Sequence, residues 1–152
     1  MKFAQNKQTN EKIKSQLNII CKEILNNVNA KSIILAGSFG YGEGPVKIKN
    51  KKIYPFNDYD IYVITKNKIP TEKIDEIASN SVNKLGLKGI KYFYNFKKED
   101  QTLEKNFYVD LKCITQKQLK KLPPRLKYYN FKESTQTLYG EDLTHLAPNF
   151  QL

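Results

Sequence analysis

The stretch "DYDIYVIT", residues 58–65, combines a run typical of a buried β-strand with two carboxylates that such a strand seldom carries. Tyrosine, isoleucine and valine are enriched in strands, so the run predicts a central strand of a sheet. Residues two apart in a strand project from one face, with Cβ atoms about 6–7 Å apart, which places Asp58 and Asp60 side by side. Such like charges raise each other's pKa, and a divalent cation would remove that cost. The alternative is a solvated pair on an edge strand.

Working outward from this strand, hydrophobic periodicity predicts an α/β (α+β) fold with a mixed β-sheet and helices packed on it. Helices are expected over 10–28, with Thr9 or Asn10 as N-cap, and over about 71–85, which Gly86 ends. Strands are expected over 32–37, 58–65, 90–96 and 106–115, with a hairpin over 46–56 and a polar turn over 97–105. Short helices are expected over 116–121 and 125–135, and a mostly irregular tail over 136–152.

Length and composition favour a single domain over residues 1–152, with its core at about 30–115 and a short helical C-terminal extension over 116–152. No apolar run approaches the roughly 18 residues of a membrane span, and the N-terminus is too polar for a signal peptide. We therefore expect a cytoplasmic protein without a membrane partner. Cys21 and Cys113 have no CxxC partner and His145 is the only histidine, so free buried thiols are expected rather than a zinc site.

A glycine-rich segment, "ILAGSFGYGEG" at residues 34–44, ends the first predicted strand. It does not match GxGxxG, and it is not a P-loop because no Gly-Lys-Ser/Thr follows. Gly37 would let the backbone come close to a ligand, and Ser38 offers a hydroxyl and a backbone N–H to a phosphate. Taken alone, however, a Gly-Ser pair after a strand is more typical of a plain turn.

A third carboxylate, Asp110, lies within the strand-like run "FYVDLKC", residues 107–113. If this strand pairs with the 58–65 strand, Asp110 can lie on the same face as Asp58 and Asp60, together with Tyr108 and Lys112. The alternate residues of the run would then face the core. Three converging carboxylates can hold two metal ions about 3.5–4 Å apart and so clamp a phosphoryl transfer.

The ordered segments "LAGSFGYGEG", "NDYDIYV" and "FYVDLKC" resemble the nucleotidyltransferase superfamily of the DNA polymerase β type, in particular its small prokaryotic, minimal members. That family is similar in having a strand that ends in Gly-Ser, Asp-x-Asp on the next strand and a third Asp on a later one. The matching residues are Gly37, Ser38, Asp58, Asp60 and Asp110. A weaker likeness lies in "QTLYGEDL", residues 136–143. The gap between the first two motifs is longer than usual, and the predicted hairpin explains the excess.

The resemblance implies an enzyme that uses Mg²⁺, for which Mn²⁺ can substitute, in a two-metal site. It would transfer a nucleoside monophosphate, expected to be AMP, from an NTP such as ATP to an acceptor hydroxyl and release pyrophosphate. Asp58, Asp60 and Asp110 would be the catalytic metal ligands, and Asp110 would help deprotonate the acceptor. Gly37 and Ser38 would bind the nucleotide phosphates. The acceptor stays open among a small molecule, a protein side chain and an RNA end.

The net charge of +11 favours polyanionic partners such as nucleotides and RNA. Nearly all of it is lysine. The resemblance implies that lysines at 47–52 or Lys112 would steady the departing pyrophosphate, and the alternative is that they are ordinary solvent-exposed lysines. Two other functions stay open: an antitoxin-like minimal nucleotidyltransferase that binds or AMP-modifies a toxin partner, as the resemblance implies, and an inactive basic RNA-binding domain. A small-molecule acceptor predicts a closed pocket lined by tyrosines from among Tyr92, Tyr94, Tyr108, Tyr128 and Tyr129.

Overall fold

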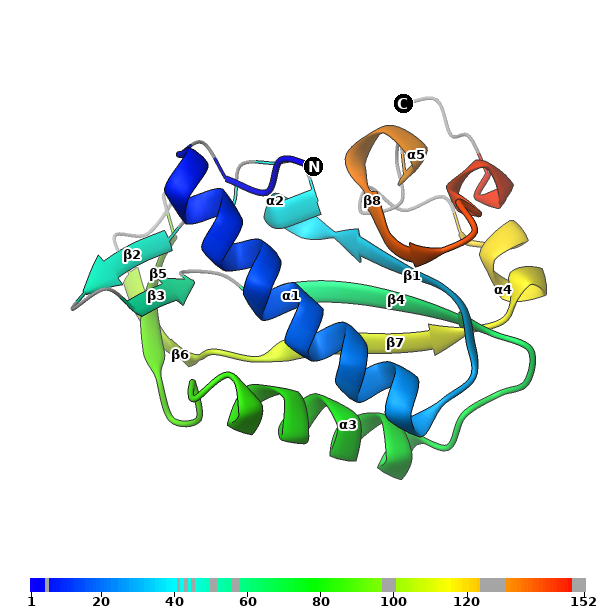
Figure 1. The fold of residues 1–152 in the computed structure, drawn as a ribbon, viewed down its shortest axis with the longest axis horizontal. Coiled ribbons are helices and arrows are strands. Elements are labelled where there is room, and N and C mark those ends of the chain that lie inside the picture. The colour runs from blue at the N-terminus through cyan, green and yellow to red at the C-terminus, as the bar shows by residue number, and fades with distance from the viewer. Residues whose placement is uncertain are drawn as a thin grey trace.

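A computed structural model describes residues 1–4, 6–40, 42, 44, 46–49, 52–55, 58–96, 101–123 and 131–148, with backbone alone at 47–49, 52–55, 91–96 and 101–105. Helices pack on a four-stranded mixed sheet, which confirms the predicted α/β fold class (Figure 1). None of the helices in these ranges has the length and hydropathy that a membrane crossing requires.

The central sheet has the strand order β7-β4-β1-β8. The interior strand β1 (Ala30–Ala36) pairs antiparallel with β4 (Tyr59–Thr65) and with β8 (Gln136–Gly140). The other interior strand, β4, pairs in parallel with β7 (Val109–Ile114). Strands buried on both faces read as near-continuous apolar runs, which explains the composition of β1 and β4. The expectation of an irregular tail was wrong at β8, whose short run becomes a strand by pairing with a segment distant in sequence.

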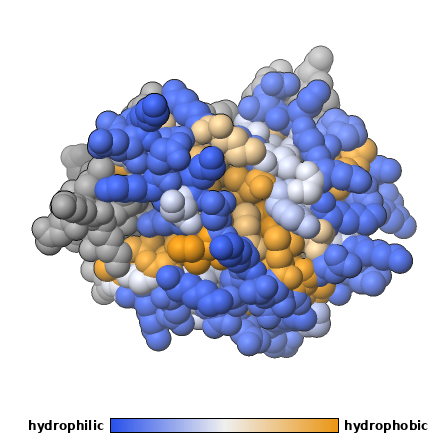
Figure 2. Space-filling model, viewed as in Figure 1, coloured by the Kyte–Doolittle hydropathy of each residue, from blue (hydrophilic) through white to orange (hydrophobic). Residues whose placement is uncertain are grey.

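One face of the sheet is covered by α1 (Lys7–Asn27) and α3 (Thr71–Lys84), which lie next to each other (Figure 1). Their outward surfaces are hydrophilic, and apolar side chains are visible alongside α1 where it packs on the sheet (Figure 2). The main core joins the apolar stripes of both helices to the strands and includes Ile13, Leu17, Ile20, Ile24, Ile33, Leu35, Ile61, Val63, Ile77 and Val109. Cys21 and Cys113 are free thiols packed against this core, and burial raises the pKa of each to about 11.

The N-cap of α1 is Asn6 rather than Thr9 or Asn10, because the Asn6 side chain accepts hydrogen bonds from the backbone N–H groups at positions 8 and 9. Asn10 instead folds back and accepts from the backbone N–H of Phe3 and Ala4. The expected N-cap was therefore wrong, because a side chain inside the first turn was recruited to hold the segment that precedes the helix.

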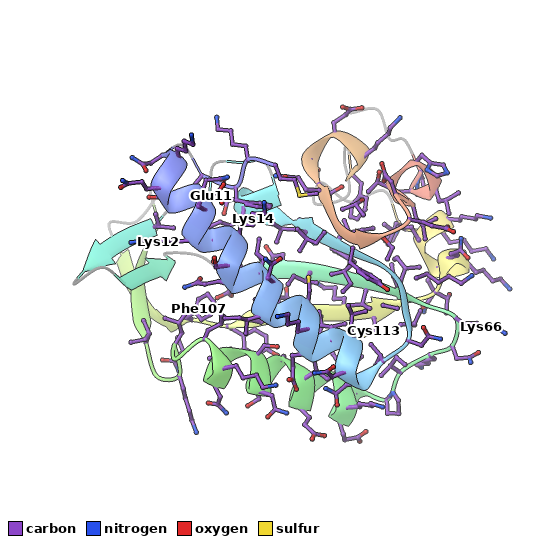
Figure 3. All side chains as sticks on the ribbon, in the orientation of Figure 1. Glu11, Lys12, Lys14, Lys66, Phe107 and Cys113 are labelled. Atoms are coloured by element: carbon purple, nitrogen blue, oxygen red, sulfur yellow. The ribbon has the colours of Figure 1, made fainter. Side chains whose placement is uncertain are left out.

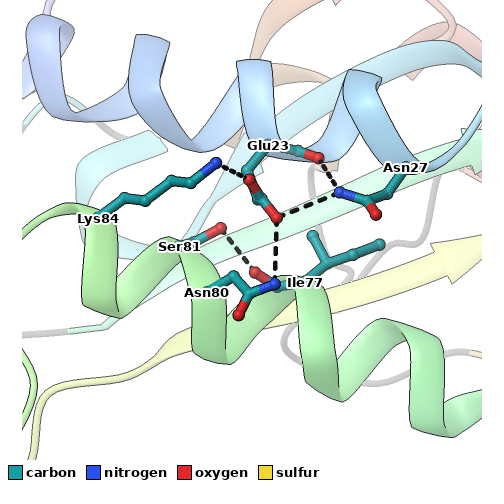
Figure 4. Close-up of polar contacts among 6 residues, drawn as sticks. All are labelled: Glu23, Asn27, Ile77, Asn80, Ser81 and Lys84. Atoms are coloured by element: carbon teal, nitrogen blue, oxygen red, sulfur yellow. Dashed lines mark hydrogen bonds and ion pairs between the residues drawn. The ribbon is translucent and has the colours of Figure 1, made fainter.

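A buried carboxylate joins α1 to α3 (Figure 4). Glu23 is 4% exposed and accepts hydrogen bonds from Asn27 Nδ2 at 3.1 Å and Asn80 Nδ2 at 3.3 Å, and it also pairs with the ammonium of Lys84. The Lys84 hydrogen bond is the main reason that the pKa of Glu23 falls below its usual value. This carboxylate is thus fully partnered and stabilises the helix pair.

Among the described residues, the second face of the sheet is covered by α4 (Gln116–Lys120), α5 (Phe131–Ser134) and the 3₁₀ turn η2 (Thr144–Leu146). These elements enclose a smaller core made of Ile34, Tyr62, Ile64, Leu119, Phe131 and Leu143. Within it, the rings of Tyr62 and Phe131 meet edge to face, with centroids 5.4 Å apart. The helix predicted over 116–121 is confirmed. The end of the helix predicted over 125–135 forms α5, and residues 124–130 lie outside the described residues.

Two hairpins complete the fold. The strands β2 (Val46–Lys49) and β3 (Lys52–Pro55) pair antiparallel, which confirms the hairpin predicted over 46–56. The strands β5 (Lys91–Phe96) and β6 (Gln101–Asn106) form a second antiparallel pair. The prediction of a polar turn over 97–105 was therefore wrong from residue 101 onward, since backbone pairing with β5 overrides the polar composition. The short helix α2 (Gly37–Gly40) directly follows β1.

Candidate active site

The strands β4 and β7 bring two carboxylates together on the second face of the sheet. In their parallel register, Asp60 lies directly opposite Asp110. Phe107, which precedes β7, and Cys113 of β7 belong to the main core on the side that faces α1 and α3 (Figure 3). Because strand residues alternate between faces, Asp60 and Asp110 share the opposite face. Asp110 was expected on this face only if its strand pairs with the 58–65 strand, and that pairing is present.

Asp58 lies one residue before β4 and is 8% exposed. Its Oδ1 accepts a hydrogen bond from the backbone N–H of Tyr108, at 3.0 Å. This bond ties the beginning of β4 to the residue that precedes β7 and fixes the carboxylate at the same end of the sheet as Asp60 and Asp110. A solvated pair on an edge strand is ruled out, because Asp58 is buried and β4 is an interior strand.

The three carboxylates act on one another electrostatically. The pKa of Asp60 is raised to about 6, first by burial and then by the negative charge of Asp110, with a smaller contribution from Asp58. The ammonium of Lys112 acts in the opposite direction. Burial beside a like charge therefore disfavours ionisation of Asp60, and carboxyl groups with such raised pKa values occur often at functional sites.

A glycine allows the chain after β1 to pass against this cluster. Gly37 has φ +68°, and a Cβ atom at this position would overlap the Oδ2 atom of Asp60. The preceding residue, Ala36, pairs with Asp60 across β1 and β4. Glycine is required at residue 37 by both the backbone conformation and the close approach. Ser38 follows in α2, so the Gly-Ser turn lies at the same end of the sheet as the carboxylates.

Lys112 is the basic residue that the described structure places at this cluster. Its Nζ lies 3.0 Å from Asp110 Oδ2 and 5.1 Å from the centroid of the Tyr62 ring. The sequence analysis proposed Lys112 for the pyrophosphate and placed it on the same face as Asp110, as its spacing of two along one strand indicates. It missed the contact with Tyr62, which follows from the register that sets Tyr62 opposite Lys112.

Tyr108 is the tyrosine of the expected set that lies beside the carboxylates with its side chain described. Its side chain is 42% exposed, and its pKa is raised by partial burial first and then by the charges of Asp75, Asp110 and Asp58. The side chains of Tyr92 and Tyr94, all of Tyr128 and Tyr129, and the lysine side chains at 47–52 fall outside the described residues. The expected tyrosine pocket therefore stays a prediction.

The carboxylates fit a cation that arrives with a phosphorylated substrate. Among the residues that the structure describes, no group of three or more His, Cys, Asp or Glu side chains forms a ready metal cage. Mg²⁺ seldom needs one, because it is usually held by one or two carboxylates and completes its shell with water and phosphate oxygens. Asp60 and Asp110 form such a pair, and the close approach of Gly37 leaves backbone rather than side chain beside them.

No protein-family model and no curated protein matches this sequence. The likeness to the nucleotidyltransferase superfamily therefore rests on the sequence motifs named above.

Proposed function

We propose that this protein is a metal-dependent nucleotidyltransferase that transfers a nucleoside monophosphate, AMP in the first instance, from an NTP to an acceptor hydroxyl. The observation that carries the proposal is the placement of Asp60 opposite Asp110, with Asp58 at the same end of the sheet and the Gly37 backbone against the Asp60 carboxylate. Like charges this close repel one another, and a bound divalent cation would offset that repulsion. The expected setting is the cytoplasm, where NTPs are available.

In the proposed site, Asp58, Asp60 and Asp110 would hold Mg²⁺, or Mn²⁺ in its place, and the bound cation would neutralise the triphosphate. Gly37 allows the backbone to approach the phosphates, and Ser38 donates a hydrogen bond to them. Phosphoryl transfer depends mainly on such positioning and charge neutralisation.

The reaction forms a bond between the acceptor oxygen and the α-phosphorus and breaks the bond from that phosphorus to the bridging oxygen of pyrophosphate. Asp110 takes the acceptor proton, and pyrophosphate leaves with the electron pair of the broken bond. Asp110 suits this role because its side chain is 40% exposed and can reach an incoming hydroxyl, whereas Asp58 is buried.

The first test is thermal unfolding with each NTP, with and without Mg²⁺, for the native protein and for the double variant Asp58→Asn/Asp60→Asn. An NTP at 100 times its Kd would stabilise the native fold by about 2.7 kcal/mol, which raises Tm by about 5–10 °C. Each protein is compared with its own ligand-free Tm. Glu76→Gln, which removes an exposed carboxylate of α3, is the matched control and should keep the full response.

A Mg²⁺-dependent shift that the double variant loses would support the site and rank the four bases. Transfer is then tested with NTP that is radiolabelled at the α-phosphate, by following pyrophosphate release and label on candidate acceptors. The absence of a shift with every NTP would contradict the proposal. Metal-independent, salt-sensitive binding to RNA would instead favour the basic RNA-binding function, and capture of a protein without nucleotide the antitoxin-like function.

A further inference from the structure

Lys112 is held from two sides at the edge of the carboxylate cluster. Its ammonium donates to Asp110 Oδ2 at 3.0 Å and lies over the Tyr62 ring, 5.1 Å from the centroid. The side chains of Lys112 and Asp110 are 36% and 40% exposed, so both can exchange partners with solvent or a ligand. A half-exposed ion pair by itself contributes little to stability.

The position of Lys112 is what makes it unusual. The carboxylate that it binds lies opposite Asp60, and Asp58 belongs to the same cluster. Its positive charge acts on Asp60 as well as on Asp110. The ammonium thus occupies, in the ligand-free protein, a carboxylate oxygen that a divalent cation would need.

We propose that Lys112 is a tethered counter-cation, which a divalent metal must displace from Asp110 and which then pairs with the phosphates of the metal-bound nucleotide. This inference rests on the proposed function. A metal ion and an ammonium group repel each other at a shared carboxylate, so Lys112 opposes the binding of metal alone. Nucleotide phosphates offer the displaced ammonium a new anion, and its flexible four-carbon stem allows the move. Lys112 is therefore a positioning residue that couples metal binding to nucleotide binding.

The Tyr62 ring keeps the ammonium near the cluster during this exchange. A lysine over an aromatic face is attracted by the ring electrons, and the ring itself is fixed by its packing against Phe131. Lys112 therefore has a resting place that does not depend on Asp110, and it stays close to the phosphates instead of extending into water.

The test measures Mn²⁺ binding to the full chain by electron paramagnetic resonance, first with Mn²⁺ alone and then with Mn²⁺ and ATP. Lys112→Met should bind Mn²⁺ alone about tenfold more tightly and Mn²⁺-ATP about tenfold more weakly than the native protein. Lys112→Arg retains the charge and should stay close to the native protein in both measurements. Lys117→Met removes an exposed lysine of α4 and should change neither. Thermal unfolding confirms that each variant is folded, and Lys112→Gln replaces Lys112→Met if the latter does not fold.

Opposite changes in the two affinities would support the proposal, because a residue with a purely structural role would weaken both. Equal or weaker binding of Mn²⁺ alone by folded Lys112→Met would overturn the counter-cation role and leave the proposed function intact. If the native protein binds Mn²⁺-ATP no better than Asp60→Asn does, the proposed function fails, and the role of Lys112 fails with it.

Discussion

Replacing Asp60 by asparagine should make the metal-free protein more stable at neutral pH, although it removes a residue of the proposed active site. The pKa of Asp60 is raised from 3.8 to about 6, mainly by burial and by the charge of Asp110. A difference of about two pKa units corresponds to about 3 kcal/mol, which the partial solvent exposure of Asp60 reduces to about 1–2 kcal/mol. The free energy of unfolding of Asp60→Asn should therefore rise by about 1–2 kcal/mol, or Tm by about 2–8 °C.

The sign of the pH dependence follows from the raised pKa. Below about pH 4, Asp60 is protonated in both the folded and the unfolded protein, so its environment has no effect on stability. Between about pH 4 and pH 6 the unfolded chain releases the proton before the folded one does, and the native protein loses stability as the pH rises. The advantage of Asp60→Asn should thus be absent near pH 4 and complete above about pH 7.

The assay is thermal unfolding in EDTA from pH 4 to pH 8. Asp142→Ala is the comparison variant, because the pKa of Asp142 is lowered whereas that of Asp60 is raised. Asp142 Oδ1 accepts hydrogen bonds from the Thr144 hydroxyl and backbone N–H and from the Thr137 hydroxyl, and the Thr144 bonds are the main reason that its pKa is lowered. Asp142→Ala should lower Tm at neutral pH, and because the pKa of Asp142 is lowered below its usual value of 3.8, this loss should persist down to about pH 4. An advantage of Asp60→Asn that does not vary with pH, or a destabilised Asp60→Asn at pH 7.5, would refute the reasoning.

Further substitutions test the packing around the site and the core. Gly37→Ala should lower the free energy of unfolding by about 2 kcal/mol, because residue 37 has a positive φ and the added Cβ would overlap the Asp60 carboxylate. In urea titrations, adding Asp60→Ala to this variant should recover part of the lost stability. Glu23→Ala should lower the free energy of unfolding by about 2 kcal/mol at pH 7. The loss should be smaller toward pH 3, because the Lys84 pair lowers the pKa of Glu23. Lys84→Ala should lower the free energy of unfolding by less, because the Lys84 side chain is half exposed. Ser32→Ala should raise Tm by about 2–4 °C, since the buried Ser32 hydroxyl has no hydrogen-bond partner among the described residues.

The sequence predicted the helices, the interior strands and the shared face of the acids, because each depends on local periodicity. The run at 58–65 can be assigned to a strand from its own residues, since apolar and aromatic residues surround two acids at a spacing of two. Asp110 could be assigned to the same face only on the condition that its strand pairs with β4, and the structure meets that condition. The strand at 32–37 and the hairpin at 46–56 were found for the same local reason.

The wrong predictions concern segments whose structure depends on strand pairing that no local pattern specifies. The strand β8 contains five residues and forms because β1 offers an unpaired edge, and β6 forms in a polar segment because β5 lies beside it. Likewise, the contact of Lys112 with Tyr62 depends on the register of two strands that are about fifty residues apart in sequence. No short pattern in the sequence specifies such a register.

Two acids of the described structure lie in opposite electrostatic environments. Glu23 lies between two helices with Asn27, Asn80 and Lys84 as partners, and its pKa is lowered, so the fold stabilises its charge. Asp60 has a like charge opposite it, and its pKa is raised, so the fold is destabilised by the same kind of charge. Asp60 lies opposite Asp110 and beside Gly37 with its positive φ, and a cation bound there would offset the repulsion between the two carboxylates.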